Sequence, residues 1–134
     1  MTNKWVVFGK APFDKNKLKN YNFSEYNTIC VNDTFVYYPE IKFDYIIFSD
    51  FSYKHLFNIG YDVKYIFPKS RSIIKYAKTH NKLNLLYYEY NNDTKICTDN
   101  TKKNLCCCPY TGLAGINYAI KQNADEILLV GFDF

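Results

Sequence analysis

The sequence predicts an α/β protein, a single Rossmann-like domain in which a mostly parallel sheet of about six strands carries helices on both faces. Three observations lead to this prediction. Short apolar runs alternate along the chain with segments of helical pattern. The apolar runs are continuous, which is typical of parallel strands buried on both faces. The 134 residues, 48% of them apolar, suffice for one core, so we expect one domain over residues 1–134.

Runs rich in β-branched and aromatic residues mark the expected strands. They are Lys4–Phe8, Thr28–Val31, Tyr45–Phe48, Val63–Phe67, Leu83–Tyr88 and Glu126–Val130. The helices expected between them are Lys15–Lys19, Asp33–Tyr38, Phe51–Ile59, Ser70–Thr79 and Gly112–Gln122. In the last helix Leu113, Ile116 and Ile120 share one stripe, and Thr111 is placed to cap the first turn. The polar stretch Tyr90–Pro109 is expected to form a long loop.

The composition indicates a cytoplasmic protein that uses no metal or other cofactor. No apolar run approaches the roughly eighteen residues of a membrane span, and Met1–Lys4 has no signal-peptide pattern. The five cysteines include the consecutive Cys106, Cys107 and Cys108, a spacing that suits neither a disulfide framework nor a zinc site, so reduced thiols are expected. The net charge of +4 comes from scattered lysines without a nucleic-acid-binding signature, which favours a small anionic ligand. Exposed tyrosine and phenylalanine side chains would permit a homo-oligomer.

The first candidate site is the turn Gly9, Lys10, Ala11 and Pro12, directly after the first strand. Glycine permits close approach of a ligand to the backbone, and ligands of parallel α/β sheets bind at the carboxyl ends of strands. The turn matches neither the dinucleotide-binding nor the P-loop pattern. An ordinary strand-to-helix turn is the alternative interpretation.

Small polar residues follow the next two strands as well. Asn32 and Asp33 come after the second strand, and Ser49 comes after the third. Their side chains would meet at one edge of the sheet, where they could bind a base or a ribose. Capping of the helices that follow is the alternative role for each of them.

Two further candidates belong to the last helix and the last strand. Thr111 and Gly112 open the helix, where free backbone N–H groups and the helix dipole favour a phosphate or carboxylate. A capped helix with a glycine for close packing is the alternative. Asp133 follows the last strand, where its carboxylate could contact a ribose or a substrate.

These pieces together resemble the bacterial sialyltransferases of the Campylobacter type. The pieces are VVFGKAP at 6–12, CVND at 30–33, TG at 111–112 and ILLVGFDF at 127–134, and they occur in the order of that family. The resemblance implies a glycosyltransferase that holds a CMP-sugar donor, CMP-sialic acid, at the carboxyl edge of its sheet. By position, Gly9 and Pro12 would then shape the turn under the nucleotide, and Asn32 would bind hydroxyl groups.

The same resemblance implies that Thr111 and Gly112 meet charged groups of the donor and that Asp133 borders the site. Lys10 stands where the family has asparagine, and the family's threonine-serine-glycine triplet is one residue shorter here. The family's catalytic histidine and lid lie beyond the strand that matches 127–134, so we expect donor binding without that general base. A non-catalytic nucleotide-binding or sensing protein of viral or phage type is the alternative hypothesis.

Overall fold

A computed structural model of the chain describes residues 2–48, 59–68, 75, 78–79, 85–91, 104–106 and 111–133. Within these residues the protein belongs to the α/β class and is built on a parallel sheet. The expected helices Phe51–Ile59 and Ser70–Thr79 lie almost wholly outside the described residues. No helix in the described ranges is long and apolar enough to cross a membrane.

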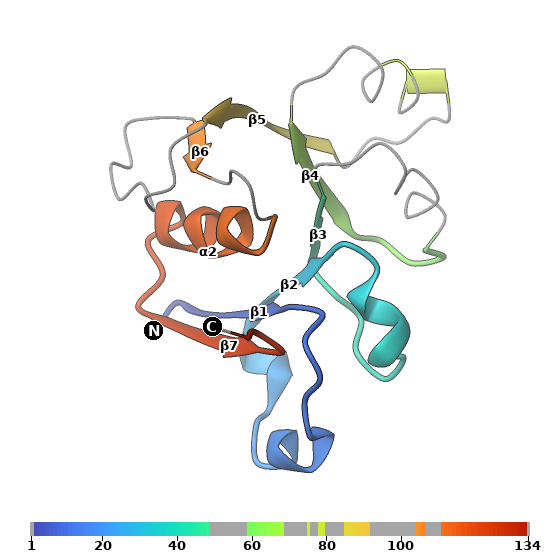
Figure 1. Ribbon diagram of the computed structural model, residues 1–134, viewed down its shortest axis with the longest axis vertical. Helices are drawn as coiled ribbons and strands as arrows, with labels where there is room; N and C mark the ends of the chain where they lie inside the picture. Colours follow the sequence, from blue (N-terminus) through green and yellow to red (C-terminus); the bar gives the residue numbers. More distant parts are fainter. Residues whose placement is uncertain are drawn as a thin grey trace.

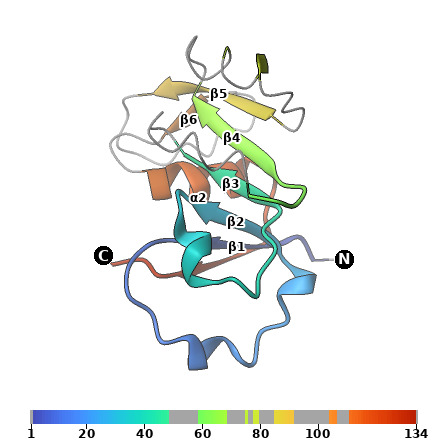
Figure 2. The same cartoon turned by 90° about the vertical axis from the view of Figure 1, so that its right-hand side faces the viewer.

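All seven strands found in these ranges pair in parallel, in the order β6-β5-β4-β3-β2-β1-β7. They are β1 (Lys4–Phe8), β2 (Asn27–Val31), β3 (Tyr45–Ile47), β4 (Lys64–Pro68), β5 (Leu85–Asn91), β6 (Asn104–Cys106) and β7 (Glu126–Val130). The strand order steps outward from β1 to β6 and then returns to the far side of β1 with β7. Figure 2 shows that the chain starts at the amino edge of the sheet and ends at the carboxyl edge.

Each expected strand run contains a strand, but the sheet has one strand more than the six expected. The stretch Tyr90–Pro109, expected as a loop, includes the short strand β6, and β5 extends to Asn91. Three residues have too short a pattern to predict a strand. The prediction was wrong there because pairing with β5, rather than local propensity, determines β6.

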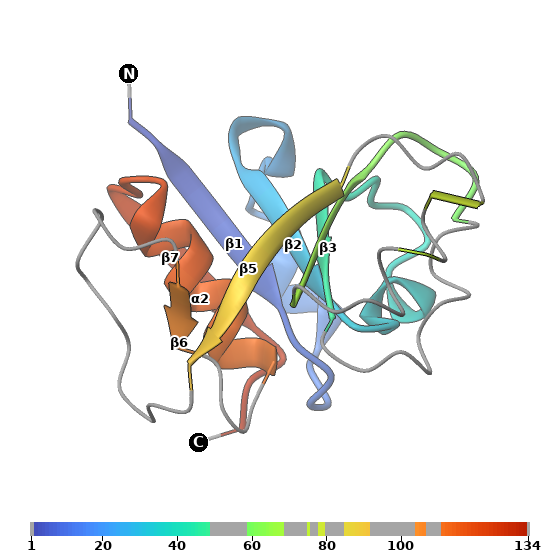
Figure 3. The ribbon, with the colours of Figure 1, turned by 90° about the horizontal axis from the view of Figure 1, so that it is seen from above.

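The two faces of the sheet have different covers. On β1, Trp5 and Val7 pack in the core beneath helix α2 (Thr111–Lys121), whereas Val6 and Phe8 face the opposite core. That second core is covered by loops with three 3₁₀-helices: η1 (Lys15–Leu18), η2 (Phe23–Glu25) and η3 (Thr34–Tyr37). Figures 1 and 3 show α2 and η3 on opposite sides of the strands.

The short helices expected at Lys15–Lys19 and Asp33–Tyr38 are therefore single 3₁₀ turns. Segments this short cannot sustain an α-helix, because nucleating the first turn is unfavourable and too few residues follow to offset it. Helix α2 begins at Thr111 itself, which places Thr111 in the first turn and not at the preceding cap position where it was expected.

The amino edge of the sheet is tied together by Asn3. Its backbone N–H donates to Asp125 Oδ2 at 2.7 Å, and its side-chain Nδ2 donates to the carbonyl of Gln122 at 2.8 Å. Asn3 Oδ1 accepts from Trp5 Nε1 at 2.9 Å and from Asn27 Nδ2 at 3.3 Å. One asparagine thus joins the beginning of the sheet to the end of α2.

Candidate functional site

The carboxyl ends of β1, β2 and β7 meet at one edge of the sheet, and the residues after these strands form the candidate site. The Gly9 N–H donates to Val130 O at 2.7 Å, and the Ala11 N–H donates to Gly131 O at 2.8 Å. These two bonds extend the β1–β7 pairing past both strands. They fix the turn of Gly9–Pro12, the first candidate site of the sequence, against the end of β7.

Part of this edge is closed by the ring of Phe132. A Cβ atom on Gly9 would lie 2.7 Å from Gly131 O and 3.1 Å from the Phe132 ring. A Cβ atom on Gly112 would lie 2.8 Å from the same ring. Both glycines are therefore required for close packing. This packing alone explains why glycine stands at each of the two positions. The structure brings them together as expected, with an aromatic ring between them.

The other side of the turn borders a cavity of about 340 Å³, which lies between the end of β1 and η3. Four turn residues form one wall, and the remaining lining comes from η1 and η3 and their flanks. The lining residues are Gly9, Lys10, Ala11, Pro12, Phe13, Lys15, Tyr37 and Tyr38. Aromatic rings and two ammonium groups thus surround a space at the carboxyl end of a parallel strand.

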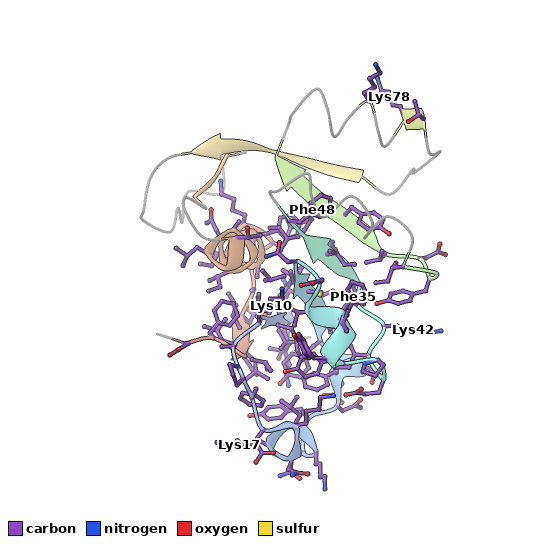
Figure 4. All side chains as sticks on the ribbon, turned by 45° about the vertical axis from the view of Figure 1, so that its right-hand side comes forward. Lys10, Lys17, Phe35, Lys42, Phe48 and Lys78 are labelled. Atoms are coloured by element: carbon purple, nitrogen blue, oxygen red, sulfur yellow. The ribbon has the colours of Figure 1, made fainter. Side chains whose placement is uncertain are left out.

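Both lysines of the cavity have identified partners. Lys15 Nζ lies over the Tyr38 ring, 5.1 Å from its centroid, in a cation–π contact that joins η1 to the end of η3. Lys10 Nζ lies 2.7 Å from Asp33 Oδ1. Figure 4 shows Lys10 beside the sheet near η3, and Lys17 at the outer end of the segment that carries η1. The two cavity lysines carry the positive charge of this edge.

The tyrosines differ in exposure. Tyr37 is 56% exposed and presents its ring to solvent, whereas Tyr38 is 4% exposed and packs in the core with Phe8. Burial, with a smaller contribution from the Glu40 carboxylate, raises the pKa of the Tyr38 hydroxyl above its usual value of about 10. Tyr38 therefore remains protonated at neutral pH, and Tyr37 is the ring open to a ligand.

Asn32 continues β2 in the left-handed conformation, with φ of 56°. Its backbone N–H donates to Ile47 O at 2.9 Å, and its carbonyl accepts from Cys30 Sγ at 3.5 Å. The side-chain amide makes no hydrogen bond within the described ranges. Asparagine is among the few residues that tolerate this conformation. The main chain of Asn32 is thus held by the sheet.

The remaining predicted site residues lie apart from the cavity. Thr111 is in the first turn of α2, beside the closed part of the edge, and Asp133 is exposed beyond β7. Neither lines the cavity. Ser49 lies outside the described residues.

Sequence reasoning missed four of the cavity residues as ligand contacts: Phe13, Lys15, Tyr37 and Tyr38. Lys15 and Tyr37 belong to η1 and η3, and Phe13 and Tyr38 flank these 3₁₀-helices, whose short patterns do not show which side chains converge. The pairing of lysine with tyrosine across two segments far apart in sequence has no local signal. The sequence does contain the aromatic pair Tyr37-Tyr38 a few residues after the second strand, which is the one signal that would have drawn notice.

Metal-ligating side chains do not gather in the part of the chain that the structure describes. Cys30 is a free thiol buried in the core, and burial raises its pKa strongly. A buried neutral thiol is an inert packing group. Cys30 is thus structural.

Comparisons with protein-family models, with curated proteins and with solved structures found no match. The fold and the site alone define the class of this chain. It is an α/β protein with a parallel sheet and a cationic, aromatic-lined cavity at the carboxyl edge of that sheet.

Proposed function

We propose that this chain binds a nucleotide-type ligand in the cavity at the carboxyl end of β1, as the donor-binding part of a sialyltransferase-like, Rossmann-like domain. The observation that carries the proposal is the combination, in one cavity, of the Gly9–Pro12 turn, the two ammonium groups of Lys10 and Lys15 and the exposed ring of Tyr37. Such a lining can take a phosphate at one end and a planar base at the other.

The position of the cavity in the sheet supports this proposal. The strand order reverses at β1, since β2 lies on one side of it and β7, the last strand, on the other. Open α/β sheets bind their ligands outside the carboxyl ends of the strands at such a reversal. The turn that leaves β1 at this point forms a wall of the cavity.

The size and charge of the cavity agree with a mononucleotide. Its volume of about 340 Å³ falls within the range of small-molecule sites. Cytidine as the base, and a sugar attached through the phosphate, come from the resemblance to the sialyltransferases. Asn32 is not among the described lining residues, but it follows the neighbouring strand β2 and is the expected contact for a hydroxyl or base group at the mouth of the cavity.

A non-catalytic role, nucleotide binding or sensing, is the second candidate, and the cavity lining favours it. Transfer of a sugar requires a base that takes the proton of the acceptor hydroxyl. Among the described residues that line the cavity there is no carboxylate and no imidazole. The raised pKa of Tyr38 keeps its hydroxyl protonated. The lining is thus equipped to bind a phosphorylated ligand, with no group to act as base.

Calorimetric titration of the chain with CMP, CMP-sialic acid, UDP and a GDP-sugar tests the proposal. We expect CMP and CMP-sialic acid to bind selectively. Lys15→Gln should weaken CMP binding about threefold to tenfold, because it removes an ammonium group from the cavity. Lys17→Gln is the matched control: Lys17 lies two residues further along η1, is exposed and does not line the cavity.

Asn32→Gly removes the side-chain amide without straining the backbone, since glycine adopts φ of 56° without penalty. This variant should also weaken CMP binding. The proposal is refuted if no nucleotide binds, or if Lys15→Gln and Lys17→Gln weaken binding equally. Release of CMP from CMP-sialic acid on addition of an acceptor sugar would favour the transferase, and binding without release would favour the sensing role.

A further inference from the structure

Asp33 occupies the N-cap position of η3 without capping it. Its side chain makes no cap hydrogen bond, although aspartate is a preferred cap residue. The other two 3₁₀-helices have side-chain caps: Asp14 Oδ1 accepts from the Asn16 N–H at 3.0 Å, and Asn22 Oδ1 accepts from the Ser24 N–H at 3.2 Å. The carboxylate of Asp33 therefore has a different role from its counterparts.

That carboxylate faces Lys10. The separation of 2.7 Å between Lys10 Nζ and Asp33 Oδ1 is that of a close ion pair, whereas the alignment falls short of a hydrogen bond, and Oδ1 is shielded from solvent. The side chains are 47% and 30% exposed, respectively. Ion pairs that solvent reaches to this extent are weak and readily exchanged.

Only one member of the pair belongs to the cavity. Lys10 lines it, and Asp33, its partner, is not among the lining residues. A ligand phosphate that enters the cavity would meet an ammonium group already paired with a carboxylate. A phosphate oxygen makes a charge-assisted contact of the same kind as a carboxylate oxygen, and a dianionic phosphate carries more charge.

We propose that Asp33 is an intramolecular competitor for the phosphate group of the ligand and so sets the specificity of the cavity for strongly charged phosphate ligands. This inference rests on the proposed function, since it assumes a phosphorylated ligand in the cavity. A doubly charged phosphate, such as that of CMP, displaces the Asp33 carboxylate from Lys10 most readily. The singly charged phosphodiester of a CMP-sugar competes less well, and a neutral group leaves the pair in place. Asp33 thus acts through Lys10, as a residue that tunes the affinity without contacting the ligand.

Charge-neutral replacement of Asp33 tests the proposal, with CMP, cytidine and inorganic pyrophosphate as probes in calorimetric titration. Asp33→Asn keeps the shape and removes the competing charge, so CMP should bind about threefold to tenfold more tightly than to the natural chain. Cytidine, which has no phosphate, should bind both chains equally. Lys10→Gln should weaken CMP binding, and in the Lys10→Gln background the Asp33→Asn change should have no further effect beyond about twofold.

Asp14→Asn is the matched control. It removes the same charge from the neighbouring η1 cap, where asparagine caps equally well, and Asp14 lies outside the cavity lining. An equal gain in affinity from Asp14→Asn and Asp33→Asn would overturn the inference, because general electrostatics would then explain both. A loss of CMP affinity in Asp33→Asn would overturn it too, since Asp33 would then be a ligand contact.

A second measurement separates this inference from the proposed function. Acetylation of the lysines with limiting acetic anhydride, followed by mass spectrometry, reports how strongly Asp33 holds Lys10 without any nucleotide. Asp33→Asn should raise the labelling of Lys10 about threefold relative to Lys17. Unchanged labelling overturns the inference whatever the nucleotides do. If the labelling of Lys10 rises but neither the natural chain nor the Asp33→Asn variant binds a phosphate probe, the proposed function is refuted, and the inference with it.

Discussion

Two asparagines at opposite edges of the sheet have opposite surroundings. Asn3, at the amino edge, uses its side chain to bind the end of α2, Trp5 Nε1 and Asn27 Nδ2. Asn32, at the carboxyl edge, is held by its main chain, and its amide makes no bond in the described ranges. A polar side chain with all its partners within the protein supports the fold, whereas one without them is available to a ligand.

Cavities occur at both edges of the sheet. They differ, like the two asparagines, in how their charged groups are held within the protein. Two cavities of about 300 and 380 Å³ share Asp44 near the amino ends of β2 and β3. Asp44 Oδ2 already accepts from the Thr28 N–H at 2.9 Å and from Thr28 Oγ1 at 3.1 Å. The acid of the amino edge thus joins two strands. At the carboxyl edge Lys10 and Asp33 form a part-exposed ion pair, which supports the proposal that a ligand binds there.

The largest effect is expected from a side chain at Gly131, where the ends of β1 and β7 are in close contact. Gly131 has φ of 71°, and a Cβ atom there would lie 2.4 Å from Gly9 O and 2.9 Å from Ala11 O. Gly131→Ala should therefore lower the free energy of unfolding by about 3 kcal/mol or more, from backbone strain and overlap together. Urea unfolding followed by circular dichroism measures it.

Gly60→Ala provides the matched comparison. Gly60 has φ of 86°, and a Cβ atom there would meet nothing within 4 Å, so only the conformational penalty of about 1–2 kcal/mol remains. The difference between the two variants isolates the contact between the ends of β1 and β7. Equal losses would show that this part of the edge is not tightly closed and that the comparison of the edges needs revision.

A smaller effect is expected from the asparagine at the amino edge. Asn3→Ala leaves Trp5 Nε1, in a ring only 3% exposed, without its acceptor, and should lower the free energy of unfolding by about 2 kcal/mol. Asn32→Gly should change it by less than about 0.5 kcal/mol while it weakens nucleotide binding. Unfolding in urea measures the first effect and calorimetry the second. Similar stability losses in both variants would remove the distinction between the two edges.

Most of the sheet could be predicted from the sequence, because its strands have a strong local signal. β1 and β7 begin and end where expected, since KWVVF and EILLV are continuous apolar runs that pack into cores on both faces. β6 could not be predicted, because pairing with β5 and not its three residues determines it. For η1 and η3 the pattern predicted a helix but could not distinguish an α-helix from a 3₁₀ turn.

The candidate site was only partly predictable, for the same reason. The turn after β1 and the polar pair Asn32-Asp33 follow strands, so their place at the carboxyl edge was expected from the topology. That Asp33 pairs with Lys10 instead of capping η3 depends on the path of two loops in space. Thr111 and Gly112 were expected to present backbone N–H groups to an anion, with close packing as the alternative for the glycine, and the Phe132 ring lies where a Gly112 side chain would be. Local patterns locate strand ends, and long-range packing decides what lies between them.

The smallest effect concerns titration, and it extends the comparison to alkaline pH. Tyr118 on α2 packs with Trp5 and Tyr45 toward the amino edge, and burial, then Tyr45, raises its pKa to about 12. A folded-state pKa above the unfolded value of about 10 stabilises the fold below pH 10, and this contribution is lost as the pH rises from about 10 toward 12. We expect a loss of about 1 kcal/mol, since solvent screens a part-buried group.

Tyr118→Phe should remove this share of the alkaline destabilisation, as measured by urea unfolding across that pH range. The control is Tyr37→Phe at the carboxyl side, which removes the same hydroxyl from a ring that is 56% exposed. If Tyr37→Phe reduced the loss as much as Tyr118→Phe does, titration would couple to folding at both edges alike. The expected result is that loss of the Tyr118 hydroxyl reduces the alkaline destabilisation, because burial in the fold raises the pKa of that hydroxyl.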